Sequence, residues 1–479
     1  MSSTTTLQHE PSLIGTRSPI AELLFLAGPT VAQMSSYTLM QFADTWMLST
    51  LGTAEPTAAG NGGLSAWSII GFGVGVMFCV NALVSQHFGH KDYKACGRYL
   101  WQGVWFALFF ALATGPVIPI APRFFRLIGH EPHLADLEGT FFRITVAATG
   151  IKLASTAFGQ FLLAVNRPWI VMLAAFCGVL VNAGANYFLI FGHGGFPRMG
   201  VAGAAWGTNI GVTVELLFLM AVVLRPKVRA VFNTADWILR PAQMRTLLSI
   251  GLSSGVQLVA DIAAWALFQS WVIGRFSTEA MAANMFMFRY LSVSFMPAFG
   301  VATAVTALVG RYIGAGRPDL AERRAHLGFL VGALWMLTCG AVYVLGRHVL
   351  MRLFTNDPEV LRMGVIVLVF AGIYQLFDAM YIVYNGALRG AGDTFVPAVA
   401  LAVLCWSITV AGGYVVARWR PDWGLAGPWV MATLYGIILG VFMLLRFTRG
   451  RWKTIRLETP EPADKVRNFV PLPEPGATA

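Results

Sequence analysis

Apolar stretches of about 20 residues recur along almost the whole chain, and a helix of that length crosses the ~30 Å hydrocarbon core of a bilayer. A membrane-spanning strand needs only ~10 residues, so runs of this length favour helices over a barrel. Hydrophobic residues make up 56% of the chain and charged residues 12%, whereas soluble domains carry about 25% charged residues. The sequence therefore predicts an all-α membrane protein with twelve transmembrane helices. The expected spans are 21–48, 63–85, 99–120, 139–164, 168–191, 199–224, 244–273, 279–309, 325–346, 360–387, 395–417 and 423–446.

Lysine and arginine are distributed unequally between the connectors on the two sides of these spans. The terminal tails and the even-numbered connectors hold 22 of the 34 basic residues, and the odd-numbered connectors hold 9. Basic residues are enriched in cytoplasmic connectors, so we expect a multi-pass protein of the inner (plasma) membrane with both termini in the cytoplasm. Topology also accounts for the net charge of +11, and a nucleic-acid partner is not expected.

The two halves of the chain resemble each other at one nearly constant offset, as in 85–92 against 310–319 and 201–205 against 424–428. Six spans per half insert both halves the same way up. This predicts two pseudo-symmetric six-helix bundles around a central cleft, related by an axis along the membrane normal. The expected parts are a cytoplasmic N-terminal tail (1–20), an N-terminal lobe (21–224), a cytoplasmic linker (225–243), a C-terminal lobe (244–448) and a cytoplasmic tail expected to be disordered (449–479).

Three aspartates, Asp44, Asp261 and Asp378, lie deep inside predicted spans. An ionised carboxylate at the bilayer centre costs ~3 kcal/mol on insertion scales. We therefore expect these side chains to face a wet cavity, a cation or a proton. A carboxylate that is neutral or hydrogen-bonded in the interior is the alternative at each position.

Other polar side chains recur near these aspartates at spacings of three or four residues, which place them on one face of a helix. The groups are Tyr37, Gln41 and Asp44; Asn182 and Asn186; and Tyr374 and Asp378. Oxygen ligands of this kind suit a hard cation such as Na⁺, or a carboxylate that takes up H⁺. Glu215 is a weaker candidate because its position in the predicted span is near a helix end.

Two basic residues and one proline inside spans complete the candidates. Lys152 and Arg289 are candidates to balance charge across a substrate cleft that also includes Gln41, and snorkelling to the membrane surface is the alternative for the two bases. Pro29 removes a backbone hydrogen bond from the helix that carries Asp44. A kink is predicted there, either a moving part or a static bend.

Motifs for catalysis are absent from the sequence, since neither HExxH nor GxxxxGK[ST] occurs. We therefore expect a chain that is not an enzyme, uses no cofactor and holds no metal beyond a transported cation. Its expected partners are small molecules and membrane lipids, and the expected state is a monomer.

Several stretches of the sequence resemble the multidrug and toxic compound extrusion (MATE) family, and in particular its NorM-like branch. They are GP at 28–29, FADT at 42–45, LGT at 51–53, LVN at 180–182 with Asn186, GAAWGT at 203–208, AGIYQLFD at 371–378 and GALRG at 386–390. The resemblance covers roughly 18–448 and includes the twelve-helix, two-lobe layout. It implies an antiporter that expels cationic or amphipathic organic compounds in exchange for Na⁺ or H⁺.

The resemblance also implies two cation sites. The carboxy-lobe site comprises Asp261, Tyr374 and Asp378, and the amino-lobe site comprises Asp44, Asn182, Asn186 and Thr208. The family more often has Glu at the position of Asp261, and its DinF-like branch usually has Asp at the position of Asn186, which leaves Asp44 as the single acid of its site. Lys152 and Arg289 have no counterpart in the family pattern. They favour the alternative function, a flippase or exporter of a lipid-linked or anionic precursor from the same superfamily.

Overall fold

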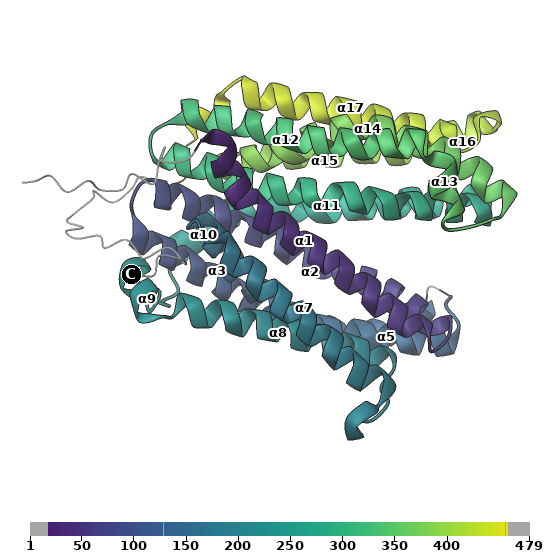
Figure 1. Ribbon diagram of the computed structural model, residues 1–479, viewed down its shortest axis with the longest axis horizontal. Coiled ribbons are helices and arrows are strands. Elements are labelled where there is room, and N and C mark those ends of the chain that lie inside the picture. The colour runs from purple at the N-terminus through teal and green to yellow at the C-terminus, as the bar shows by residue number, and fades with distance from the viewer. Residues whose placement is uncertain (1–17, 128, 456, 458–479) are drawn as a thin grey trace, which may run out of the picture.

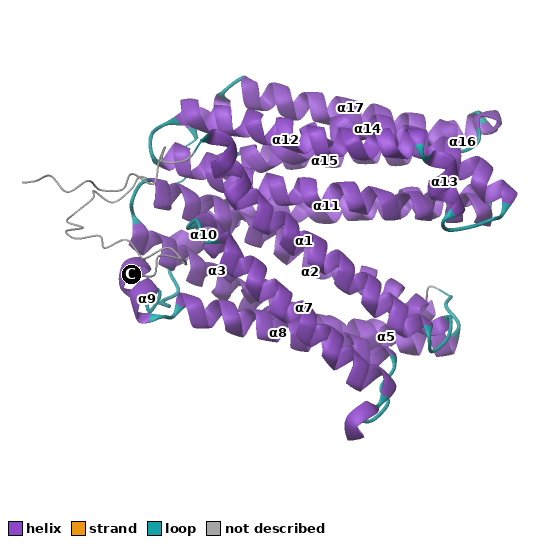
Figure 2. Cartoon of the chain, viewed as in Figure 1, coloured by secondary structure: helices purple, strands orange, loops and turns teal. Residues whose placement is uncertain are grey.

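The computed structural model describes residues 18–127, 129–455 and 457. Over these residues every regular element is a helix (Figure 2). Most of the two predicted tails, namely 1–17, 456 and 458–479, lies outside the described residues.

The first half of the chain forms the helices α1 (Pro19–Ser49), α2 (Ala54–Gly89), α3 (Tyr93–Thr114), α4 (Ala121–Leu127), α5 (Pro132–Ala147), α6 (Thr149–Ala164), α7 (Pro168–Phe191) and α8 (Val201–Val223). The short helix α9 (Pro226–Phe232) lies in the predicted linker. The second half forms α10 (Pro241–Leu267), α11 (Thr278–Gly314), α12 (Pro318–Leu345), α13 (Arg347–Arg352), α14 (Pro358–Ala391), α15 (Phe395–Leu404), α16 (Gly413–Trp419) and α17 (Ala426–Thr448).

Ten of the described helices, some of them with a short continuation, are long and apolar enough to cross a membrane, and the bent pair α5 and α6 makes an eleventh. The remaining predicted span is α1, which has 31 residues and carries polar side chains along its length. The predicted span 139–164 is therefore two helices, bent by 47°. At the break, the Thr149 hydroxyl donates to the carbonyl of Val146 at 2.6 Å, a local bond that competes with regular helix geometry.

The helices form two bundles, which lie above and below one another in Figure 1. The first helix of each half begins in the core of the bundle formed by the other half. Leu23 and Leu26 of α1 pack in the core built by α11, α12, α14 and α17. Leu247 and Ile250, at the equivalent place in α10, pack in the core built by α2, α3, α6 and α7. The exchange holds the bundles together at one end of the molecule.

Backbone geometry confirms the internal repeat. Lys91 and Gly316, which follow the equivalent helices α2 and α11, both have a positive φ, of 64° and 71°. Gly200 and Gly424, which precede the equivalent helices α8 and α17, have φ of 53° and 52°. The repeat therefore extends from the helices to the turns between them.

We call the end that carries 90–92, 224–240 and 315–317 the linker end. The α2–α3 turn and the end of α11 meet there, because His90 Nδ1 lies 3.0 Å from the carbonyl oxygen of Gly314. The linker also packs there, because Trp101 of α3 donates to the carbonyl of Thr234 at 2.9 Å. The first helix begins at this end, where Glu22 Oε2 lies 2.7 Å from Nε of Arg324.

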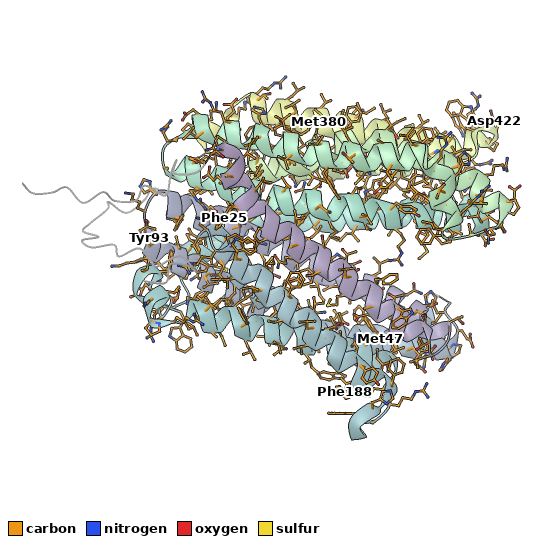
Figure 3. The ribbon with its side chains drawn as sticks, viewed as in Figure 1. Phe25, Met47, Tyr93, Phe188, Met380 and Asp422 are labelled. Carbon is orange, nitrogen blue, oxygen red and sulfur yellow. The ribbon has the colours of Figure 1, made fainter. Side chains whose placement is uncertain are left out.

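Helix α1 crosses from one bundle to the other, from the upper bundle at the left of Figure 1 to the lower bundle at the right. Figure 3 marks this course with Phe25 near its start and Met47 near its end. It continues as one helix through Pro29, and the kink predicted at that residue stays a prediction. Next to the proline, Thr30 Oγ1 lies 3.0 Å from the carbonyl oxygen of Gly300 on α11. The first half of α1 is thus attached to the C-terminal bundle, and Leu48 packs in the N-terminal one.

Candidate ion-binding sites

The four residues expected in the amino-lobe site come together from three helices. Asn186 of α7 donates from Nδ2 to Asp44 Oδ1 of α1 at 2.5 Å. Asn182, one turn earlier on α7, donates to Thr208 Oγ1 of α8 at 3.4 Å. The side chains of Thr208 and Asn182 also lie close to the Asp44 carboxylate. Within the described chain Asp44 has no ion-pair partner, so neutral groups alone surround it.

Glycines on α8 make room for the two asparagines. A Cβ at Gly207 would overlap Oδ1 of Asn186, and a Cβ at Gly211 would lie 2.9 Å from Cβ of Asn182. A larger residue at either position would push α7 away from α8. The sequence pattern had drawn attention to the asparagines but not to these glycines, which permit the close approach.

Two oxygens of this cluster are unused. Oδ1 of Asn182 and Oδ1 of Asn186 are buried and accept no hydrogen bond. Unsatisfied buried oxygens are costly. With the carboxylate of Asp44 and the hydroxyl of Thr208, they form an all-oxygen donor set that fits a hard cation. The same carboxylate can take up a proton, so the geometry fits either ion.

The carboxy-lobe residues also lie together. The side chains of Asp378 and Tyr374, one turn apart on α14, lie close together, and Asp261 of α10 is close enough to interact with Asp378 electrostatically. Trp265, one turn further along α10, also lies close to the Asp261 carboxylate. Two neighbouring carboxylates repel each other when both are ionised. A cation between them, or a proton on one of them, removes this repulsion.

Aromatic packing holds Tyr374 in place. A Cβ at Gly436 of α17 would overlap the Tyr374 ring, so this glycine lets α17 pack directly on it. The Trp265 ring meets the Tyr374 ring edge to face, with 6.2 Å between the ring centres. These two contacts fix the position of the Tyr374 ring between α14, α17 and α10.

A cavity of about 50 Å³ lies beside Asp261, at the boundary between the two halves of the chain. A water molecule needs roughly 10–15 Å³ of such volume, and drug-sized pockets have about 300–1,000 Å³. The cavity thus suits a few waters or ions. It is lined by Phe78 of α2 and by Ser254, Gln257, Leu258, Asp261, Phe295, Phe299, Ala302, Thr303, Tyr381, Ile382, Asn385, Gly386 and Arg389.

The pattern of spans placed Arg389 in a connector, and this was wrong. Helix α14 continues to Ala391, four residues beyond the predicted span, so Arg389 lies inside the helix and lines the cavity that contains Asp261. Its guanidinium lies 5.1 Å from the centre of the Phe78 ring. Tyr381 lines the same cavity as Asp261 and Arg389. A basic residue inside a run of small residues, GALRG, was the available signal.

The remaining predicted residues do not join these clusters. Gln41 and Arg289 are exposed, and Lys152 is half-buried. Lys152 was expected deep within a long span, but the break after Ala148 places it in the first turn of α6. In the described part of the chain none of the three forms an ion pair or hydrogen bond with a candidate carboxylate.

Glu215 was expected near a helix end, and the structure corrects this. It lies well inside α8 and is 6% exposed. Its Oε1 accepts a hydrogen bond from the Tyr37 hydroxyl at 2.7 Å. Tyr37 had been grouped with Asp44 by its spacing on α1, but its partner is a different carboxylate.

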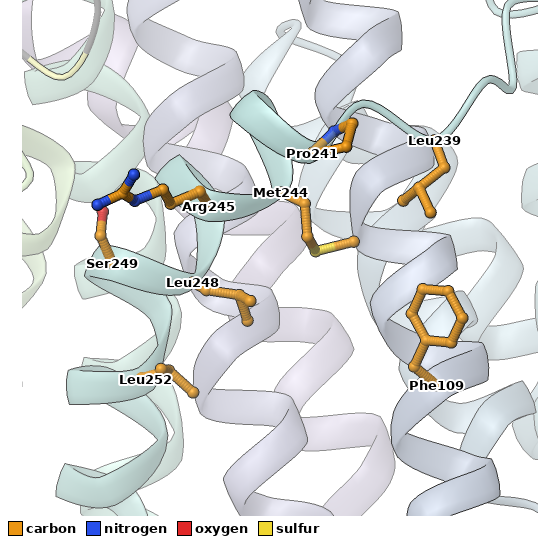
Figure 4. A pocket seen from close by; sticks show the side chains of 8 residues that line it. All are labelled: Phe109, Leu239, Pro241, Met244, Arg245, Leu248, Ser249 and Leu252. Atoms are coloured by element: carbon orange, nitrogen blue, oxygen red, sulfur yellow. The ribbon is translucent and has the colours of Figure 1, made fainter.

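A larger pocket lies away from both clusters. It has about 520 Å³ and is mostly apolar, and it lies on the surface between α3 and α10 near the linker end (Figure 4). Phe109, Leu248 and Leu252 form its apolar wall, and Arg245 contributes a charge. It contains no candidate carboxylate and is therefore not an ion site of the kind described above.

Two pseudo-symmetric helical bundles, each with a cluster of side-chain oxygens around a carboxylate inside its spans, are the arrangement of a two-lobed membrane transporter. Residues 29–188 and 262–415 match the MatE family, and the chain belongs to this family. The resemblance found in the sequence is thereby confirmed.

Relatives named as multidrug resistance proteins match over most of the chain. A probable multidrug resistance protein NorM of Mesorhizobium japonicum is 28% identical and covers 90% of this chain and 94% of its own. The multidrug resistance protein PmpM of Pseudomonas aeruginosa is 27% identical and covers 92% and 93%.

Solved structures share the fold. An outward-facing multidrug resistance MATE family transporter of the MOP superfamily superimposes with a TM-score of 0.84 at 19% identity, over 93% of this chain and 98% of its own. A MOP superfamily transporter from Pyrococcus furiosus, described as having a binding pocket of reverse polarity, also gives 0.84 at 19% identity, over 92% and 98%. At these identities the likeness concerns the fold alone.

Proposed function

We propose that this protein is a secondary active exporter that moves cationic or amphipathic organic compounds out of the cell in exchange for Na⁺ or H⁺. The observation that carries the proposal is the presence of a carboxylate cluster within the membrane-spanning helices of each bundle. Asp44, Asn182, Asn186 and Thr208 would bind the ion in the N-terminal lobe, and Asp261, Tyr374 and Asp378 in the C-terminal lobe. The relatives named as multidrug resistance proteins support the class of substrate.

Exchange requires that ion and substrate favour different conformations, because a ligand shifts an equilibrium only through its different affinities for the two states. In the proposed cycle the two bundles open alternately to the two sides of the membrane. Ion binding neutralises Asp44 or the pair Asp261 and Asp378 and favours one state, and the substrate favours the other. The chain's own role is to hold these oxygens, exclude lipid and link the two bundles through α1 and α10.

The proposed setting is the inner (plasma) membrane, with the linker end and both termini in the cytoplasm. The distribution of basic residues supports this orientation. The partners are small-molecule drugs or toxins and the surrounding lipids, with a monomer as the working unit.

One observation favours a second candidate, the export or flipping of a lipid-linked or anionic precursor. Arg389 is a basic residue on the wall of the cavity between the halves, and a basic group there would attract an anionic substrate. Lys152 and Arg289, which prompted this alternative in the sequence, do not lie at the cavity.

The test is efflux of a cationic dye from proteoliposomes under a Na⁺ gradient or a proton gradient alone, with Asp44→Asn and Asp378→Asn beside the unaltered protein. Asp422→Asn is the matched control, because Asp422 is exposed and pairs with Arg420 at the surface. We expect gradient-driven efflux that both buried substitutions reduce and the control leaves unchanged. Absence of efflux under either gradient would overturn the exporter. Full efflux by both buried variants would show that the ion sites are wrongly assigned.

A further inference from the structure

Glu215 is a buried carboxylate of the N-terminal lobe that lies apart from the Asp44 cluster and, at 6% exposed, is nearly inaccessible to solvent. Glu215 accepts a hydrogen bond from the Tyr37 hydroxyl at 2.7 Å. The Tyr37 oxygen in turn accepts from Nε2 of Gln33 at 3.2 Å. On its other side, Glu215 lies close to the side chain of Ser155 on α6. Three helices therefore converge on this one carboxyl group.

The position of Glu215 follows a regular spacing. Tyr37 lies seven residues before Asp44 on α1, and Glu215 lies seven residues after Thr208 on α8. Helix α1 begins at the linker end and α8 finishes there, so the two helices run in opposite directions (Figure 1). Seven residues of helix rise about 10 Å. The Tyr37–Glu215 pair thus lies two turns closer to the linker end than the Asp44–Thr208 pair.

Glu215 has no counter-charge beside it in the described part of the chain, where it forms no ion pair. Lys152 lies one turn before Ser155 on α6. Its ammonium group shows no electrostatic interaction with the Glu215 carboxylate. Gly178 of α7 lies against Glu215, and a Cβ added to this glycine would lie 3.3 Å from the Cβ of Glu215. A buried carboxylate without a cation is costly unless it takes a proton.

The hydrogen bonds favour a proton over a metal cation at this place. The Tyr37 hydroxyl directs its hydrogen at the carboxylate and its oxygen already accepts from Gln33, which leaves it poorly oriented as a cation ligand. In the Asp44 cluster, by contrast, two amide oxygens are unused. The two places thus differ in their chemistry although they share the same pair of helices.

We infer that Glu215 is a second proton-binding carboxylate of the N-terminal lobe and that Tyr37 positions it. Glu215 takes one proton from water and later returns it to water, and only an O–H bond forms and breaks. The ionised carboxylate accepts a strong charge-assisted bond from Tyr37, and the neutral acid accepts a weaker one. Protonation therefore loosens the contact between α8 and α1, the helix that also carries Asp44 and reaches the other bundle. The link to transport rests on the proposed exchange function.

The direct test is infrared difference spectroscopy of the full-length protein in liposomes between acidic and alkaline pH. We expect a carboxylic C=O band that disappears in Glu215→Gln, is restored in Glu215→Asp, and persists in Asp44→Asn. In Tyr37→Phe the band should change frequency, because the carboxyl group loses a hydrogen-bond partner. A spectrum that Glu215→Gln leaves unchanged would overturn the inference, and this measurement requires no transport.

A second arm measures proton-driven dye efflux. Glu215→Gln should lower the rate of proton-driven efflux by about tenfold, with little change in dye affinity. A loss of this size is expected when one charge-assisted hydrogen bond can no longer form and weaken with protonation. Glu131→Gln, an exposed glutamate in the loop before α5, is the matched control. Unchanged efflux in Glu215→Gln, in a preparation whose unaltered protein transports, would remove Glu215 from coupling. Absence of transport in the unaltered protein would instead count against the exporter and leave the infrared result to decide the proton site.

Discussion

Gly89 of α2 and Gly314 of α11 occupy equivalent positions in the two halves, and each lies against the backbone of the other's helix. A Cβ at Gly89 would overlap the carbonyl oxygen of Arg311, and a Cβ at Gly314 would overlap the carbonyl oxygen of Gln86. The crossing is therefore symmetric and allows no side chain on either glycine. It joins the first helical hairpins of the two halves at the linker end.

Gly89→Leu should separate this crossing. Overpacking a tight contact costs about 1–3 kcal/mol. This free energy would change the ratio of molecules with a closed linker end to molecules with an open one by roughly five- to 150-fold. We expect increased labelling by a membrane-impermeant thiol reagent of a cysteine introduced at Ala315, and reduced efflux. Gly28→Ala is the control, since nothing lies within 4 Å of a Cβ there. Equal labelling in the two variants would show that the crossing is not part of the conformational change.

Gly207→Ala should impair the N-terminal ion site without removing any ligand. The added methyl group overlaps Oδ1 of Asn186, whose amide donates to Asp44. A strain of about 1–3 kcal/mol at this contact should weaken ion-driven efflux by about tenfold or more. Gly60→Ala, where a Cβ meets nothing within 4 Å, is the matched control. If the two variants transported equally well, the position of Asn186 would not matter for coupling.

Arg324→Gln should lower the stability of the protein in detergent. The pair formed by Arg324 and Glu22 is only 8% and 12% exposed, and removing one partner of a buried ion pair costs about 3–5 kcal/mol. We expect a lower midpoint of thermal unfolding, recovered in large part when Glu22→Gln is added. Arg362→Gln breaks a pair that is 71% and 58% exposed and should cost less than about 1 kcal/mol. A double variant as unstable as the single one would argue that packing, not charge, attaches α1.

Asp92 should make the linker end sensitive to acid. It caps α3 by accepting from the Ala95 amide at 3.2 Å, and a hydrogen bond from His87 lowers the pKa of its carboxyl group although burial opposes this. Because the pKa of Asp92 is lower in the folded state, its ionised carboxylate stabilises the fold at a pH above the unfolded-state pKa of about 3.9. This stabilisation is lost as the pH falls through the folded-state pKa.

The comparison that tests this is thermal unfolding of the unaltered protein and of Asp92→Asn between pH 3 and pH 7. Asn keeps the cap but cannot ionise, so the difference in stability should be constant near neutral pH and shrink below about pH 4. Asp92→Ala should cost about 1 kcal/mol through the lost cap. A difference that does not change with pH would contradict the role of the charge.

The twelve spans, the internal repeat and the buried acids could all be predicted from the sequence. Each depends on a property of one stretch of chain. An apolar run of the right length crosses a bilayer wherever it occurs, and the cost of Asp378 in hydrocarbon depends little on its neighbours. Neighbours on a single helix, such as Tyr374 and Asp378, follow from spacing alone, and the family resemblance indicated which helices bring the candidate residues together.

The tertiary structure decided which helix faces which. Spacing on α1 grouped Tyr37 with Asp44, but Tyr37 bonds to Glu215 on α8. A charge count placed Arg389 in a connector, but it lies on the wall of a cavity with Asp261. Hydrophobicity acts on each segment separately, and so can be read along the chain. Contacts between helices depend on their rotation and on small residues such as Gly207, and these appear only when distant segments pack together.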